Sequence, residues 1–188
     1  MISKLMKKMI EYSEGSLHDI NHFMKVHSFA RTIGTLEEVD SDTQTIIEVA
    51  AMVHDIACPS LRERYGVANG KLQETEGMIL ARAFLDDSGL SEELIDRIVY
   101  LVGHHHTIDQ IDGIDYQILI EADYLVNADE SSYSKDNIKN TLDTVFKTQT
   151  GKELLTNIYL RWREYTTWVR KANKCVSLKM EHIKRLKL

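Results

Sequence analysis

Histidines and carboxylates at helical spacing are the residues of this chain that could do chemistry. His54 and Asp55 are adjacent in the run Ile-Glu-Val-Ala-Ala-Met-Val-His-Asp. Ala50 and Val53 precede His54 at the spacing of one helical face, so we expect the imidazole to lie on the buried side of a helix. A buried polar group costs free energy unless it is paired. A metal ion would satisfy His54 and Asp55 together.

Two more polar residues fall on apolar faces elsewhere in the chain. His22 stands four residues before Val26 in a predicted helix. His27 lies about 140° away around the same helix, so His22 is the better candidate. Asp123 follows Leu119 by four residues and shares its apolar stripe in a third helix. The sequence therefore predicts an inward-facing cluster supplied by three helices.

The predicted cluster, His22, His54, Asp55 and Asp123, has the composition of a metal site. Two imidazoles and two carboxylates suit one divalent ion such as manganese, iron, cobalt, nickel or magnesium, with positions left for water and substrate. Such an ion lowers the pKa of bound water and polarises a phosphoryl oxygen. Hydrolysis of a phosphate ester or anhydride is the chemistry we expect.

The composition is that of one soluble domain. The chain has 188 residues, of which 43% are hydrophobic and 28% charged. It has no apolar run near the roughly 18 residues of a membrane span, and its N-terminus lacks a signal-peptide core. We therefore expect a cytoplasmic protein without membrane contact. Cys58 and Cys175 match neither a disulfide framework nor a zinc pattern, so we expect free thiols.

The charge is spread unevenly. The net charge of −6 argues against nucleic acid as a partner. Residues 161–188 nevertheless hold nine Lys/Arg and two Asp/Glu, which leaves the rest of the chain acidic. This basic segment could touch phosphates or an acidic neighbour, although a solvated helix is the simpler interpretation.

The apolar periodicity is helical nearly throughout, and one proline and nine glycines leave few forced breaks. We predict an all-α fold. Ser41 and Gln44 form a possible capping box for the helix that carries His54, and Pro59 is expected to end that helix. The expected helices span about 2–13, 18–38, 41–58, 73–87, 91–103 and 115–129. The segments 59–72 and 107–114 are expected loops, and 134–188 forms three or four further helices with Trp162 and Trp168 as packing anchors.

The order His, His-Asp, Asp on these helices resembles the HD-domain metal-dependent phosphohydrolase superfamily. The run His18-Asp-Ile-Asn-His22-Phe-Met-Lys25-Val is similar to the His-Asp-x-x-His-x-x-Arg-Val pattern of a bacterial HD subgroup. Ala-Ala-Met-Val-His54-Asp55 and Ile-Glu-Ala-Asp123-Tyr-Leu resemble its other two signatures. The resemblance implies a helical bundle with the ion between core helices. It also implies a single HD domain over 1–188, with a core of about 16–130 and a C-terminal helical extension over 131–188.

The chain departs from this pattern at three places. Lys25 replaces the usual arginine and loses its bidentate geometry toward phosphate. Members with two metals carry another histidine after the His-Asp pair, whereas here no histidine lies between 54 and 104 and Gln73 occupies that place. One metal ion is therefore favoured. Some members have a glutamate base where this chain has Cys58, so the general base is open between unaided metal-bound water, His18 and Glu76.

Further residues could act on the substrate. His104 and His105 follow the fifth predicted helix, where the family often places histidines that face the metal, and they could stabilise phosphate charge or protonate a leaving oxygen. His106 is expected to cap that helix. Lys71 could contact phosphate, as could Arg62 and Arg64, although charges in a loop are usually just solvated. His18 and Lys25 are the other candidate substrate contacts, and His18 could instead cap its own helix.

These patterns together predict an HD-type phosphohydrolase that uses one divalent ion to cleave a small phosphorylated metabolite, with a nucleotide as the first choice. One alternative is a non-catalytic nucleotide or metal sensor on the same fold. The other is a di-iron HD-fold oxygenase, which would need the additional histidine ligand. The sequence leaves a homo-oligomer open as a partner state.

Overall fold

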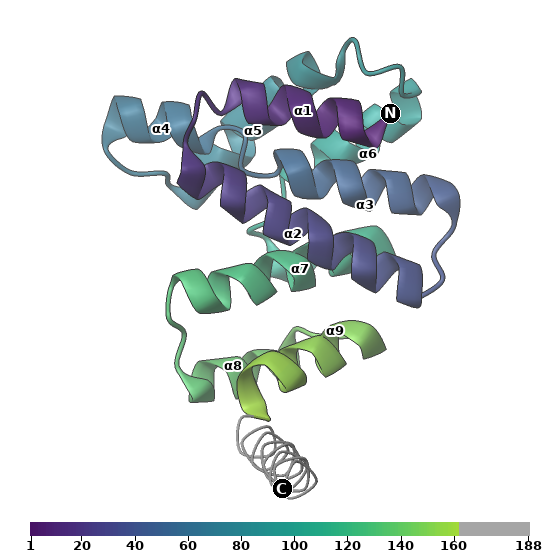
Figure 1. Cartoon of the computed structure of the whole chain (residues 1–188), viewed down its shortest axis with the longest axis vertical. Helices are drawn as coiled ribbons and strands as arrows, with labels where there is room; N and C mark the ends of the chain where they lie inside the picture. Colours follow the sequence, from purple (N-terminus) through teal and green to yellow (C-terminus); the bar gives the residue numbers. More distant parts are fainter. Residues whose placement is uncertain (162–188) are drawn as a thin grey trace, which may run out of the picture. The chain divides into compact units, whose positions relative to one another are not determined.

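The computed structural model describes residues 1–161, and the predicted anchors Trp162 and Trp168 lie outside this range. The described residues form helices and contain no strand, which confirms the all-α prediction (Figure 1). The α-helices are α1 (Ile2–Tyr12), α2 (Leu17–Leu36), α3 (Ser41–Val53), α4 (Cys58–Tyr65), α5 (Gly70–Leu85), α6 (Glu92–Val102), α7 (Ile114–Glu130), α8 (Lys135–Thr144) and α9 (Gln149–Leu155). A 3₁₀ turn spans Ile108–Gln110, and a π-helical turn spans Thr156–Leu160.

The chain divides into two compact units, Met1–Lys152 and Glu153–Leu188. The first unit carries every candidate site residue. Of the second unit, residues 153–161 are described, and they comprise the end of α9 and the π-helical turn. No helix in the described residues is both long and apolar enough to cross a membrane.

The core of the first unit is built where α2, α3 and α7 pack against one another, with α6 against α3 (Figure 1). Val26 and Ala30 of α2, Ala50 of α3 and Leu119 of α7 are all fully buried, as their helical spacing predicts. The three helices that meet here are those expected to carry the site. Their packing fixes where the polar residues on their inner faces can point.

The region after the His-Asp pair differs from the predicted loop over 59–72. It contains α4, with Pro59 in the first turn and Gly66 in a left-handed conformation at its end. Proline stops a helix that precedes it but is favourable at the first positions of the next, because its missing N–H would be unpaired there in any case. Helix α3 ends at Val53 and not at residue 58, so the expectation that Pro59 ends it was wrong. His54 and Asp55 begin the turn that leads into α4.

Helix starts also differ by a few residues from the prediction. Asp40, and not Ser41, caps α3, because its side chain accepts hydrogen bonds from the backbone N–H groups of Asp42 and Thr43. Helix α5 begins at Gly70 and not near Gln73, since Asn69 caps it through the N–H of Lys71. The earlier start places Gln73 and Glu74 inside the first two turns of α5.

Candidate metal centre

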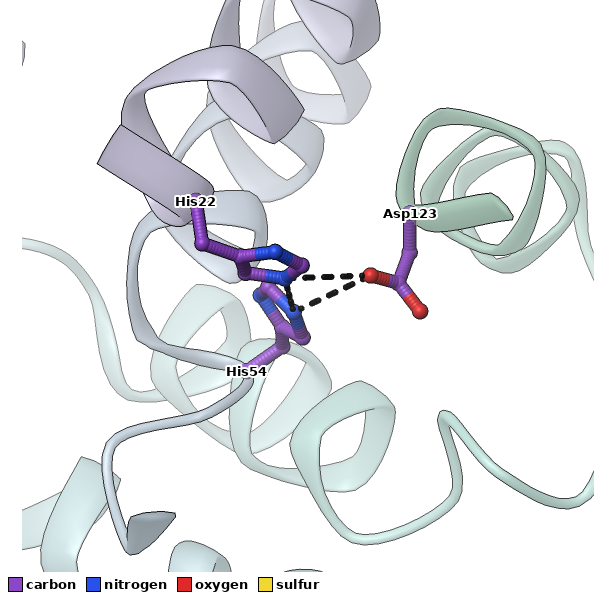
Figure 2. A group of neighbouring side chains, drawn as sticks. All are labelled: His22, His54 and Asp123. Atoms are coloured by element: carbon purple, nitrogen blue, oxygen red, sulfur yellow. Dashed lines mark hydrogen bonds and ion pairs between the residues drawn. The ribbon is translucent and has the colours of Figure 1, made fainter. Parts of the chain in front are cut away.

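Three of the predicted ligands meet in the interior of the first unit. Figure 2 shows His22 from α2, His54 after α3 and Asp123 from α7 pointing toward one another. The Nε2 atoms of His22 and His54 are 3.2 Å apart, and Asp123 Oδ1 lies 3.3 Å from the first and 3.4 Å from the second. His22 and His54 are buried and Asp123 is half-buried. These three residues form a group that could hold a metal ion.

Asp55 brings the fourth predicted ligand to the same place. Its Oδ2 lies 3.4 Å from the Nε2 atoms of both His22 and His54. Its other oxygen, Oδ1, lies 3.5 Å from the Nε2 of His105. Asp55 therefore stands between the three-residue group and the histidines that follow α6.

The imidazoles are oriented by their outer nitrogens. Nδ1 of His54 is 3.1 Å from the carbonyl oxygen of Ala51, and Nδ1 of His22 is 2.8 Å from Oε2 of Glu130. Each outer nitrogen faces an acceptor, so it carries the proton in the neutral ring and leaves the Nε2 lone pair pointing inward. Two inward lone pairs beside two carboxylates form a set of acceptors that a divalent cation fits.

The cluster shifts the pKa of its own members. Burial would lower the pKa of His54, but Asp55 and Asp123 outweigh it and hold that pKa well above its ordinary value. The pKa of His22 is raised in the same way, with Asp123 as the main opposing partner. Burial would raise the pKa of Asp55, yet His54 and His105 keep it well below its usual range. The carboxylates therefore stay ionised at neutral pH and are ready to bind a cation.

A second group adjoins the first. Asp55, His105 and His106 also place one ligand atom each within reach of a common ion. His105 Nδ1 is 2.7 Å from the carbonyl oxygen of Val102, and its buried Nε2 has no hydrogen-bond partner. Burial and the neighbouring His105 lower the pKa of His106 to about 4, so this ring is neutral near pH 7. His106 Nε2 hydrogen-bonds Oε1 of Gln73, so the residue expected as a helix cap belongs to the site.

The structure separates His104 from its neighbours. His104 Nδ1 lies 2.7 Å from the carbonyl oxygen of Tyr100, and its ring stacks on that of Tyr100. The hydroxyl of Tyr116 donates to the carbonyl oxygens of His104 and Thr107, which fixes the turn. Of these two histidines, only His105 directs a ring nitrogen at a member of the predicted cluster, Asp55. Helical spacing fails here because α6 ends at Val102.

Glu76, the other candidate base, is turned to one side of the site. Its carboxylate pairs with Arg64 of α4. The buried carboxylate of α5 is instead Glu74, whose Oε1 accepts from the backbone N–H of His106 at 3.2 Å and from the Thr107 hydroxyl at 2.9 Å. Glu74 thus fastens the histidine turn to α5.

The predicted substrate contacts occupy different surroundings. His18 is exposed, whereas its neighbour Asp19 lines a small pocket together with His22 and Asp55. Asp19 Oδ2 accepts hydrogen bonds from Ser16 Oγ at 2.6 Å and from Arg62. Asp19 thus links Arg62 of α4 to a residue that lines this pocket.

The two predicted lysines also differ. The side chain of Lys71 is 85% exposed, with its Nζ 3.9 Å from Glu74. Lys25 Nζ lies 3.0 Å from Oε1 of Glu130. Sequence reasoning missed Glu130, although it stands seven residues after Asp123 and therefore shares its helical face.

Comparisons with known proteins support the fold. No protein-family model and no curated protein matches the sequence. Among solved structures, the chain is similar to a predicted HD superfamily hydrolase from an uncultured Thermotogales bacterium, with 19% identity, a TM-score of 0.61 and coverage of 92% of this chain and 91% of that one. It is also similar to an HD-superfamily hydrolase from Bacillus thuringiensis, with 16% identity, a TM-score of 0.57 and coverage of 92% and 96%. The chain therefore has the fold of the HD superfamily hydrolases.

Proposed function

We propose that this protein is a metal-dependent phosphohydrolase that cleaves a phosphoester or phosphoanhydride bond of a small phosphorylated metabolite, with nucleotides as the first substrates to test. The observation that carries the proposal is the convergence of the Nε2 atoms of His22 and His54, 3.2 Å apart, each of which lies within 3.4 Å of one oxygen of Asp55 and one of Asp123. The fold shared with two HD superfamily hydrolases supports the reaction class.

His22, His54, Asp55 and Asp123 would hold one divalent ion. Such an ion would supply a water of lowered pKa as nucleophile and would offset charge on the phosphoryl group. The residues themselves set the geometry, because their outer hydrogen bonds keep both Nε2 lone pairs turned inward. Manganese, iron, cobalt, nickel and magnesium all accept such a ligand set.

His105 is the candidate for proton transfer. Its Nε2 is buried, has no hydrogen-bond partner and lies 3.5 Å from Asp55 Oδ1. An imidazole in this position can hold a proton at Nε2 and give it to the leaving oxygen. Arg62, which pairs with Asp19, is a further candidate contact for a phosphate.

The test is phosphate and pyrophosphate release from a panel of nucleotides and other phosphoesters. The protein is stripped with a chelator and resupplied with Mn²⁺. Release that requires Mn²⁺, disappears in Asp55→Ala and persists in Asp87→Asn supports the proposal. Asp87 is a matched control, because its carboxylate pairs with Lys8 in another part of the unit. Stoichiometric Mn²⁺ binding with no turnover across the panel would contradict it and favour a sensor.

The second group, Asp55, His105 and His106, supports one further candidate. With Asp55 shared between the groups, two ions could bind. The site would then be compatible with a di-iron oxygenase. Metal analysis of the purified protein distinguishes the one-metal phosphohydrolase from the di-iron oxygenase. We expect one divalent ion per chain, and two bound iron ions per chain would favour the oxygenase.

A further inference from the structure

His22 is held differently from the other imidazoles of the site. His54 and His105 direct their Nδ1 atoms at main-chain carbonyl oxygens, those of Ala51 and Val102. His22 directs its Nδ1 at a side chain, with Oε2 of Glu130 at 2.8 Å. A main-chain carbonyl is a neutral acceptor that the helix supplies by itself. A carboxylate is a charged acceptor that must be positioned and kept ionised.

Lys25 provides that positioning. Its Nζ lies 3.0 Å from Oε1 of Glu130, while Oε2 faces His22. The two oxygens of one carboxylate therefore have one partner each. The ammonium of Lys25 thereby holds the carboxylate with Oε2 toward the imidazole of His22.

The arrangement follows from the same two helices that supply metal ligands. Lys25 stands one turn after His22 on α2, and Glu130 stands two turns after Asp123 on α7. Packing α2 against α7 to bring His22 to Asp123 therefore also brings Lys25 to Glu130. The sequence pattern suggested that Lys25 binds substrate phosphate, whereas the structure gives its ammonium a carboxylate partner.

We propose that Glu130 and Lys25 form one positioning unit that fixes the tautomer and direction of His22 and thereby sets the affinity of the site for a divalent cation. The inference rests on the proposed function for its metal, but it concerns cation affinity and not turnover. Glu130 accepts a hydrogen bond from the Nδ1–H of His22, which leaves the Nε2 lone pair facing Asp123 and His54. Lys25 acts through Glu130, because it holds the carboxylate in place.

The experiment measures the dissociation constant for Mn²⁺ alone, from the electron paramagnetic resonance signal of free Mn²⁺ at one fixed pH. The full chain is compared with Glu130→Ala, Lys25→Met, the double variant and Lys25→Arg. Lys8→Met is the matched control, since Lys8 pairs with a carboxylate outside the site. Thermal unfolding of each metal-free variant checks that the fold is kept.

We expect Glu130→Ala to weaken Mn²⁺ binding about 10- to 100-fold, the usual range for a residue that orients a metal-binding histidine. Lys25→Met weakens it by a smaller factor, and Lys25→Arg restores binding to within about twofold of wild type. The double variant binds no more weakly than Glu130→Ala, because the two residues act in series. A purely structural role would shift unfolding instead and give additive losses.

Unchanged Mn²⁺ affinity in Glu130→Ala, or additive losses in the double variant, would overturn the inference. A higher KM for a substrate in Lys25→Met, together with unchanged Mn²⁺ affinity, would also overturn the inference, because Lys25 would then contact the substrate. If Glu130→Ala does not fold, Glu130→Gln replaces it. We expect Glu130→Gln to weaken Mn²⁺ binding at least about threefold, and unchanged Mn²⁺ affinity in this variant would overturn the inference. Normal Mn²⁺ responses without any phosphoester turnover would contradict the proposed function and leave the positioning unit intact.

Discussion

Glu121 and Asp123 are two of the carboxylates that helix α7 removes from bulk water, and their surroundings differ. Glu121 is fully buried. Its Oε1 accepts from Gln117 Nε2 at 2.7 Å and from the backbone N–H groups of Lys147 and Thr148 at 2.6 and 3.0 Å. Its Oε2 accepts from the hydroxyl of Thr148. Each of these partners of Glu121 is a neutral hydrogen-bond donor.

Asp123 faces a different set of partners. Asn127 Nδ2 donates to it at 2.9 Å, but its other close neighbours are the Nε2 atoms of His22 and His54, whose rings already donate through Nδ1. Glu121 closes a hydrogen-bond network and thereby joins α7 to the segment before α9. Asp123 belongs to a set of converging acceptors that a cation would complete. The partners of a buried carboxylate, and not its burial, separate a structural role from a site.

The largest effect is expected at Asp123. Asp123→Asn keeps the shape of the side chain but removes its negative charge from the residues that would bind the cation. Mn²⁺ affinity should therefore fall at least about 100-fold and Mn²⁺-dependent turnover at least about 1,000-fold. The metal-free protein keeps its fold, as checked by circular dichroism. Equilibrium dialysis against Mn²⁺ and the phosphate-release assay measure the two effects. Wild-type affinity in this variant would remove Asp123 from the ligand set.

Glu121→Ala is expected to do the reverse. It leaves the N–H groups of Lys147 and Thr148 without their acceptor, so the free energy of unfolding falls by about 3 kcal/mol. Chemical denaturation measures the loss. Mn²⁺ affinity of the folded protein stays at the wild-type value, since none of the acceptors at the site is touched. A large fall in Mn²⁺ affinity with unchanged stability would contradict the difference in role between Glu121 and Asp123.

The pH dependence of Mn²⁺ binding tests whether His22 and His54 bind the cation. His22 and His54 have raised pKa values, so both carry protons above the pH at which a free imidazole loses them. Mn²⁺ must displace those protons, and its affinity therefore rises with pH until both raised pKa values are passed. Below that point each unit of pH weakens binding about 10-fold per displaced proton. Titrations across pH 6 to 9 measure the slope, and a flat profile would contradict the ligand assignment.

A smaller effect is expected at His27. Its Nε2 is 3.0 Å from Glu48 Oε2, while Gln44 Nε2 is 2.9 Å from Glu48 Oε1. His27→Gln removes one of the hydrogen bonds of Glu48 and should cost about 1 kcal/mol of stability. Mn²⁺ affinity should not change, because His27 faces Glu48 and not the cluster. The matched substitution His22→Gln should lower Mn²⁺ affinity. Equal effects of His22→Gln and His27→Gln on Mn²⁺ binding would contradict the placement of His22 in the cluster and of His27 outside it.

Helical periodicity was sufficient to predict the all-α class and to bring four polar residues together, whereas the HD-type arrangement was implied by the resemblance. His22, His54 and Asp123 each lie on an apolar stripe, and the packing of apolar stripes forces such residues inward. Asp55 follows because it adjoins His54. The choice of His22 over His27 agrees with where the two rings point.

Other features could not be predicted because they depend on chain ends and tertiary contacts. Residues 103–106 leave the α6 helix, so helical spacing could not separate His104 from His105. Pro59 was interpreted as a stop, although proline also starts helices, and α4 was missed. Glu121 finds its main-chain donors 26 and 27 residues away, and Glu130 finds Lys25 105 residues away, distances at which no local pattern operates.

Anomalous diffraction at the manganese absorption edge, from crystals soaked in Mn²⁺, tests the central claim most directly. The account predicts one strong peak at bonding distance, about 2.0–2.3 Å, from the Nε2 atoms of His22 and His54 and from carboxylate oxygens of Asp55 and Asp123. The peak should be absent from crystals of Asp123→Asn. A manganese peak elsewhere, with none between His22, His54 and Asp123, would contradict the account.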